Sequence, residues 1–127
     1  MSKSILIVDD NEPVRDVLHS LIEAKTGFEV SEASNGEEAI GKALMLKPDL
    51  VVLDLALSPD GINGVEAASL LKTYLPQTRI LVFTMYGEML GKSLTGTIGI
   101  DAVVSKSDGV AKVIEFVEKL LPPDVNP

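Results

Sequence analysis

The chain has 127 residues, enough for one domain that buries roughly two-thirds of its unfolded surface. Its composition, 46% hydrophobic and 24% charged, is typical of a globular protein. A net charge of −8 argues against binding of nucleic acid or anionic lipid, and the lack of cysteine excludes disulfides, thiolate catalysis and Cys-based zinc sites. No segment has the length and hydropathy of a signal-peptide core or a membrane span, so we expect a cytoplasmic protein with no membrane contact.

The first half of the chain predicts three strands, two of which end in carboxylates. Ile5 to Val8 is an apolar run that leads into the pair Asp9-Asp10. Leu50 to Leu53 is a second apolar run, typical of a strand buried on both faces of a parallel sheet, and it ends at Asp54. The alternating segment 28–33 lies between them and is typical of an edge strand.

Two helices are expected between these strands. Asn11 is followed by an acid and a proline, and apolar residues then recur at helical spacing as far as Gly27. The segment Ser34-Asn35-Gly36-Glu37 is a capping-box pattern that opens the second helix, which ends at Lys47-Pro48. His19 is the only histidine and falls on the polar face of the first helix, where we expect a solvated surface residue rather than a catalytic base.

The second half continues the alternation of strands and helices. Asn63 is expected to cap a helix from Gly64 to Leu75, with Val65 among its inward residues. The later elements follow in order: a strand from Arg79 to Thr84, a weakly specified helix from about Gly87 to Leu94, a strand from Ala102 to Ser105 closed by Lys106, and a last helix capped by Asp108.

Strand and helix alternate five times with short connections. This pattern predicts a doubly wound α/β domain with a five-stranded parallel sheet, flavodoxin-like, over residues 1–121. Residues 122–127 are rich in proline and are expected to form a tail or the stub of a linker.

Polar residues stand at the carboxyl ends of the predicted strands, the edge where open α/β sheets bind ligands. They are Asp9, Asp10, Asp54, Thr84 and Lys106. Three carboxylates in one cleft repel each other unless a proton or a cation joins them, and oxygen ligands without His or Cys suit Mg²⁺. A carboxylate beside such a metal can attack phosphorus, while a lysine and a hydroxyl hold the phosphoryl oxygens. The residues therefore favour phosphoryl transfer onto Asp54.

In this order and spacing, the chain from Ile5 to about Leu121 resembles the receiver domain of two-component response regulators. The resemblance implies the strand order 2-1-3-4-5 and makes Asp54 the phosphoacceptor. It also implies that Mg²⁺ is held by Asp9, Asp10, Asp54 and the backbone carbonyl of Ala56. Lys106 would pair with the phosphoryl group, and Thr84 would move to bond it.

By the same resemblance, the chain is a signalling switch rather than a turnover enzyme. Its donor would be a sensor histidine kinase or a histidine phosphotransfer protein, and its state would pass through the fourth helix, fifth strand and fifth helix. Phosphorylation could produce a homodimer, and no direct nucleic acid contact is expected.

The sequence departs from the family pattern in places. Val103 stands where the family commonly has an aromatic, Ser107 replaces the usual proline, and the loop after Asp54 is about two residues longer. One alternative is a pseudo-receiver, a protein-interaction module that phosphorylation does not control. Another is an enzyme or cofactor carrier of the same architecture, although no Gly-rich fingerprint or P-loop is present.

Overall fold

The computed structural model describes residues 3–57, 61–85 and 99–122. Five parallel strands form one sheet in the order β2-β1-β3-β4-β5, as expected. The strands are β1 Ser4–Val8, β2 Glu29–Ala33, β3 Leu50–Leu53, β4 Arg79–Thr84 and β5 Ala102–Ser105. The helices are α1 Glu12–Thr26, α2 Gly36–Leu46, α3 Gly64–Tyr74, the short 3₁₀ helix η1 Lys106–Asp108, and α5 Val110–Leu120. The predicted helix from Gly87 to Leu94 lies outside the described residues.

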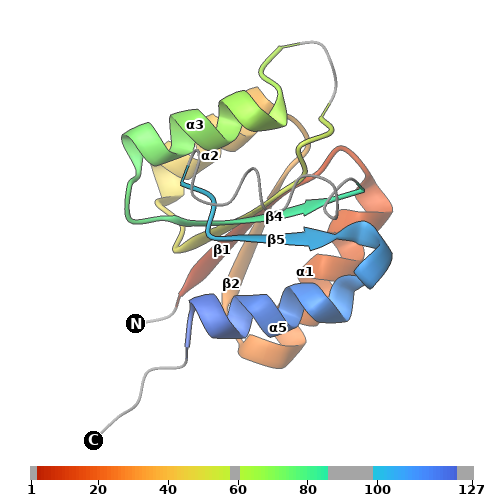
Figure 1. Ribbon diagram of the computed structural model, residues 1–127. Coiled ribbons are helices and arrows are strands. Elements are labelled where there is room, and N and C mark those ends of the chain that lie inside the picture. Colours follow the sequence, from red (N-terminus) through yellow and green to blue (C-terminus); the bar gives the residue numbers. More distant parts are fainter. Residues whose placement is uncertain (1–2, 58–60, 86–98, 123–127) are drawn as a thin grey trace, which may run out of the picture.

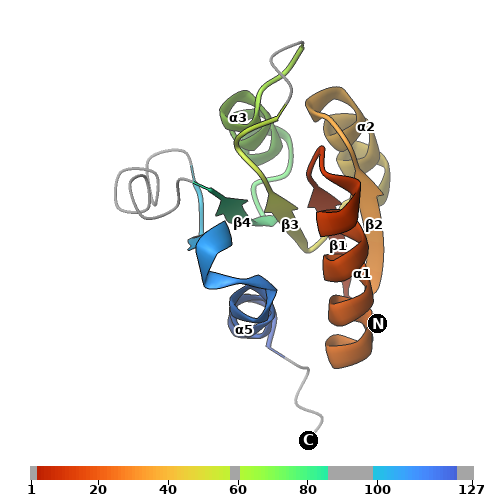
Figure 2. The ribbon, with the colours of Figure 1, turned by 90° about the vertical axis from the view of Figure 1, so that its right-hand side faces the viewer.

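Helices cover both faces of the sheet, which makes three layers. Helices α1 and α5 lie on one face, and α2 and α3 lie on the other (Figure 1). The view turned by 90° shows the strands in cross-section between these two helix pairs (Figure 2). From β1 the chain runs to β2 on one side and then to β3, β4 and β5 on the other side. Right-handed crossovers in these two directions put helices on opposite faces of the sheet, which is the doubly wound arrangement.

Alternation along the strands divides the apolar side chains into two cores. Along β1, Ile5 and Ile7 belong to the core under α1 and α5. Leu6 and Val8 belong to the core under α2 and α3. Successive side chains in a strand point to opposite faces, so a strand that is apolar throughout feeds both cores. Asp9 and Asp54 continue this alternation beyond the strand ends.

Asparagine caps open three of the helices, and for Asn11 and Asn63 the sequence predicted the cap. The side chains of Asn11, Asn35 and Asn63 each accept a backbone N–H from the first turn of α1, α2 and α3. Asn63 and Glu66 form a reciprocal capping box. Such caps satisfy N–H groups that the helix itself leaves without partners, at about 1 kcal/mol each.

Two expectations about individual residues are wrong. Val65 is 45% exposed, and the inward positions of α3 are taken by Ala67, Ala68 and Leu71. Asp108 does not cap the last helix, because it lies in η1 and Gly109 precedes α5 without a side-chain cap. Gly109 has φ 86°, a conformation that glycine adopts at low cost, and it turns the chain from η1 into α5.

Glycine 64 allows α3 to begin directly against the end of β3. A Cβ at this position would lie 2.3 Å from Leu55 Cα and 2.7 Å from the carbonyl oxygen of Asp54. The backbone of α3 therefore contacts the backbone of Asp54 and Leu55. Within the described residues, every helix is too short or too polar to cross a bilayer.

Candidate functional site

Three strands deliver Asp9, Asp54 and Lys106 to the same face of the sheet. Each stands two residues beyond a strand residue of the core under α1 and α5: Asp9 beyond Ile7, Asp54 beyond Val52, and Lys106 beyond Val104. A period of two places such residues on a common face. The alternation of the strands therefore brings together side chains that lie far apart in the sequence.

A single ammonium group joins two of the carboxylates. Lys106 Nζ lies 2.9 Å from Asp9 Oδ2 and 2.9 Å from Asp54 Oδ2. The second oxygen of each carboxylate accepts a backbone N–H, from Asn11 to Asp9 at 2.9 Å and from Ala56 to Asp54 at 2.9 Å. Both carboxyl groups are thereby held in fixed orientations.

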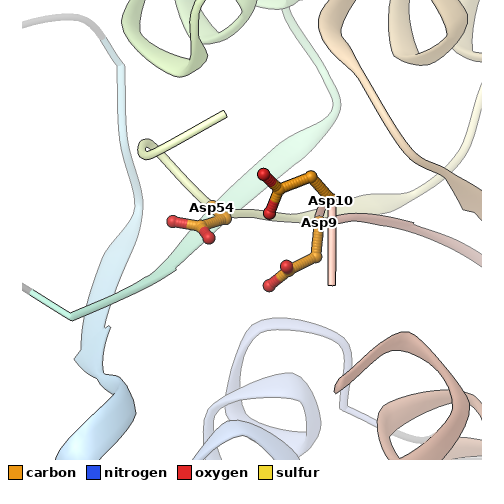
Figure 3. A group of neighbouring side chains, drawn as sticks. All are labelled: Asp9, Asp10 and Asp54. Carbon is orange, nitrogen blue, oxygen red and sulfur yellow. The ribbon is translucent and has the colours of Figure 1, made fainter. Parts of the chain in front are cut away.

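Asp10 completes an acidic cluster at the ends of β1 and β3. Ligand oxygens of Asp9, Asp10 and Asp54 all lie within 4.8 Å of one another, and Figure 3 shows the three side chains gathered there. Asp9 and Asp54 are 1% and 4% exposed, whereas Asp10 is exposed, so the cluster is open to solvent on one side. Oxygen ligands without His or Cys suit Mg²⁺, which keeps several waters beside one or two carboxylates.

Burial and hydrogen bonding change the pKa values of Asp9 and Lys106. Burial raises the pKa of Asp9 above its ordinary value, and the nearby charge of Asp54 adds to this effect against hydrogen bonds from Lys106 and Asn11. Burial alone would lower the pKa of Lys106, but its hydrogen bonds to Asp54 and Asp9 outweigh burial and raise it. Lys106 therefore stays charged, and a proton on Asp9 would compete with a divalent cation for that carboxylate.

The hydroxyl of Thr84 makes no hydrogen bond to the acids. It is fully buried, and its Oγ1 has no hydrogen-bond partner among the described residues. Thr84 stands two residues beyond Val82, which belongs to the core under α2 and α3, so its alternation is opposite to that of Asp54. Ala56 is exposed beside Asp54, and a metal-ligating role for its carbonyl stays a prediction.

Two further residues touch the site, and the sequence interpretation did not include them. Arg15, from α1, donates to the backbone carbonyl of Asp9 at 2.6 Å. The ring of Phe83 lies 5.9 Å from Lys106 Nζ. Phe83 has the same alternation as Leu81 in the core under α1 and α5, a signal that could have placed it beneath Lys106. No pattern in the sequence indicates that Arg15 contacts the backbone carbonyl of Asp9.

Comparison with known proteins defines the class. The family profile of the response regulator receiver domain matches residues 5–118. The chain belongs to this family, and its parallel sheet in the order 2-1-3-4-5 is the fold of its structural neighbours.

Particular relatives cover nearly all of the chain. The response regulator protein VraR of Staphylococcus aureus (strain NCTC 8325 / PS 47) is 35% identical over 94% of this chain, which spans 56% of that relative's length. A LuxR-family response regulator from Aurantimonas sp. SI85-9A1 is 32% identical with a TM-score of 0.84, over 95% of this chain and 86% of the other. The response regulator TrrA from Thermotoga maritima, solved in complex with Mg²⁺ and BeF, is 34% identical with a TM-score of 0.81, over 94% and 99% of the two chains.

Proposed function

We propose that this domain is a phosphoacceptor switch that takes a phosphoryl group from a phosphohistidine onto Asp54. The observation that carries the proposal is the contact between Lys106 and both buried carboxylates at the end of the sheet. An oxygen of Asp54 would form a bond to phosphorus as the bond from phosphorus to the donor nitrogen breaks, and the donor imidazole would keep that electron pair. The donor is a sensor histidine kinase or a histidine phosphotransfer protein.

The chain's own groups provide the positioning that such a transfer needs. The backbone N–H of Ala56 orients Asp54 through its Oδ1. Lys106, which donates to Asp54 Oδ2, would neutralise charge on the phosphoryl oxygens. Positioned cations of this kind act on charge that develops in the transition state. Asp9, Asp10, Asp54 and the carbonyl of Ala56 would hold Mg²⁺, which supplies further neutralisation of the phosphoryl oxygens.

Thr84 would report the phosphorylated state. Its Oγ1 is buried without a hydrogen-bond partner among the described residues, a state that costs about 1–3 kcal/mol. A phosphoryl oxygen on Asp54 would give the hydroxyl an acceptor and so favour a rearranged end of β4. The change would pass to the surface of β5, α5 and the predicted helix from Gly87 to Leu94.

A cytoplasmic location and homodimer formation on phosphorylation belong to the same proposal.

The test is incubation with acetyl phosphate and Mg²⁺, followed by intact-protein mass spectrometry. The parent chain should gain one phosphoryl group, and Asp54→Asn should gain none. Asp16→Asn removes an exposed carboxylate on α1 and is the matched control, which should be labelled like the parent. Labelling that survives Asp54→Asn would show that another residue is the acceptor. A parent chain that is never labelled would favour the pseudo-receiver alternative.

A further inference from the structure

Arg15 connects the acidic cluster to residues outside it. Its guanidinium donates to the carbonyl oxygen of Asp9 at 2.6 Å and to Glu32 Oε1 at 3.1 Å. The Arg15 side chain is 15% exposed and lies between α1 and the ends of β1 and β2. A planar guanidinium that makes two directed hydrogen bonds fixes the relative positions of its partners.

His19 holds the other oxygen of the same carboxylate. His19 Nδ1 lies 2.7 Å from Glu32 Oε2, and His19 Nε2 lies 3.3 Å from Glu23 Oε2. A neutral imidazole has one N–H and one lone pair, so it can donate to only one of these carboxylates. Both contacts are favourable only when the ring is protonated.

The charges around His19 favour the protonated ring. Burial alone would lower the pKa of His19, but the hydrogen bond to Glu32 and the charge of Glu23 outweigh it and raise the pKa. From α2, Lys42 Nζ donates to the backbone carbonyl of Glu32. His19 is thus an ion-pair partner in the described structure, which corrects its interpretation as a solvated surface residue.

The carbonyl oxygen that accepts from Arg15 is part of the backbone that joins Asp9 to Asp10. It belongs to the peptide between Asp9 and Asp10, so the orientation of this peptide sets where both side chains begin. The N–H of Asp9 is fixed separately, by the carbonyl of Ala33 at 3.1 Å. Among the described contacts, Arg15 is the side chain that holds the peptide between Asp9 and Asp10.

We propose that Arg15, Glu32 and His19 form a positioning network that sets the orientation of Asp9 and Asp10 for cation binding. Protonated His19 holds Glu32, Glu32 holds Arg15, and Arg15 holds the peptide between the two acids. The inference rests on the proposed function, because it assumes that the acidic cluster binds Mg²⁺. It adds that protonation of His19 tightens this binding.

Charge and positioning make opposite predictions for Arg15. A cation beside the cluster repels Mg²⁺, so its removal would tighten binding if charge alone mattered. If Arg15 positions the acids, Arg15→Met weakens binding, and outer-shell partners of metal ligands typically contribute 10-fold or more. We expect Arg15→Met to raise the Mg²⁺ dissociation constant about 10-fold, measured by amide chemical-shift titration. Arg15→Lys keeps the charge but loses the planar pair of donors. Its Mg²⁺ dissociation constant should lie between those of the parent and Arg15→Met.

Lys25→Met is the matched control for charge. Lys25 lies in the last turn of the same helix, and its removal changes the net charge by the same amount. It should bind Mg²⁺ as tightly as the parent or slightly more tightly. Thermal denaturation of each variant verifies that it is folded.

The His19 arm of the network has its own tests. At pH 6, His19→Gln should weaken Mg²⁺ binding in the parent but have no further effect in the Arg15→Met background, because the two residues act in one network. The single histidine also gives a direct NMR readout. Coupling between sites is reciprocal, so Mg²⁺ should move the His19 titration to higher pH, whereas repulsion between two cations would move it lower.

The outcomes separate this inference from the proposed function. A parent chain that binds no Mg²⁺ removes the proposed function and the inference with it. Normal binding by the parent, together with equal or tighter binding by Arg15→Met, overturns the inference alone. A His19 titration that stays in place or moves to lower pH when Mg²⁺ binds would overturn the role of His19.

Discussion

Lys106 donates a hydrogen bond to Asp54 at 2.9 Å, although 52 residues separate them in the sequence. Strand β4 lies between their two strands in the sheet, so the lysine side chain crosses the end of β4 to reach the carboxylate. The ring of Phe83 lies beneath this path, 5.9 Å from Nζ. The ammonium group thus reaches Asp54 over an aromatic surface.

Lys106→Met should separate metal binding from phosphoryl transfer. The ammonium group competes with a cation for Asp9 and Asp54, so its loss should tighten Mg²⁺ binding. The same loss removes a donor to the phosphoryl oxygens and should slow labelling by acetyl phosphate about 100-fold. Lys112→Met, on the exposed side of α5, should change neither quantity. Slower labelling together with weaker Mg²⁺ binding would contradict this division of roles.

Asp9→Asn should stabilise the domain at neutral pH in the absence of divalent cations. Burial, the largest cause, raises the pKa of Asp9 above 3.8, so the folded protein holds this proton more tightly than the unfolded chain. The free energy of unfolding therefore falls as pH rises from 3.8 through the folded-state pKa, and the loss persists above it. We expect a gain of about 1 kcal/mol for the variant at pH 7.5, typical of a relieved functional site.

The pH and metal dependence provide the check on this prediction. Thermal denaturation should show the gain disappearing below pH 3.8, where Asp9 is protonated in both states. Saturating Mg²⁺ should favour the parent, because the cation stabilises only the folded state that binds it. An Asp9→Asn variant that is less stable than the parent at pH 7.5 without metal would show that the Lys106 contact outweighs burial.

Much of the site could be predicted because its geometry follows from strand alternation and strand ends. Asp9, Asp54 and Lys106 each continue the period of two in their strands, and parallel strands end at one edge. The contacts of Arg15 and His19 could not be predicted in this way. Their partner Glu32 lies on β2, and the contact depends on how α1 packs across the sheet.

The errors in the helices have a similar origin. The apolar pattern alone predicts that Val65 points inward. In the structure α3 packs on the sheet through Ala67 and Ala68, and the helix face that carries Val65 is exposed. An acid before an apolar run is typical of a helix cap, which predicts that role for Asp108, yet the turn through η1 makes Gly109 the residue before α5. Both errors depend on tertiary packing rather than on local propensity.

Two glycine substitutions should change stability in opposite directions. Gly61 has φ 89°, and a Cβ there would lie 2.2 Å from Glu37 Oε1, which accepts the N–H of Ile62 at 2.6 Å. Gly61→Ala should therefore cost about 1–3 kcal/mol. Gly41 lies inside α2 with open space around it, so Gly41→Ala should gain about 0.5–1 kcal/mol.

Urea denaturation of the two variants measures this difference. Glu37→Ala in the Gly61→Ala background then tests whether the clash with the Glu37 side chain causes the loss of stability. The loop between β3 and α3 is attached to α2 through Glu37, so the two substitutions should be less than additive. Full additivity would show that the strained backbone at Gly61 accounts for the whole cost.

The acyl phosphate on Asp54 should be long-lived, because no side chain at position 56 orients a water molecule. Hydrolysis requires water to approach phosphorus in line with the Asp54 oxygen. Ala56 is exposed beside this path, and its N–H is already used by Asp54 Oδ1. Ala56→Asn adds a donor and an acceptor there and should shorten the half-life about 10- to 100-fold, since positioning of one water can limit such a step.

The decay of phosphorylated protein in Mg²⁺, followed by intact mass, measures this half-life. Ala111→Asn adds the same amide to an exposed position of α5 and should leave the decay unchanged. Tyr86 lies outside the described residues, but its position two residues beyond Thr84 predicts that it also borders the water path. Tyr86→Glu tests this prediction. If neither Ala56→Asn nor Tyr86→Glu decays faster than the parent, water reaches phosphorus by a route that these two residues do not border.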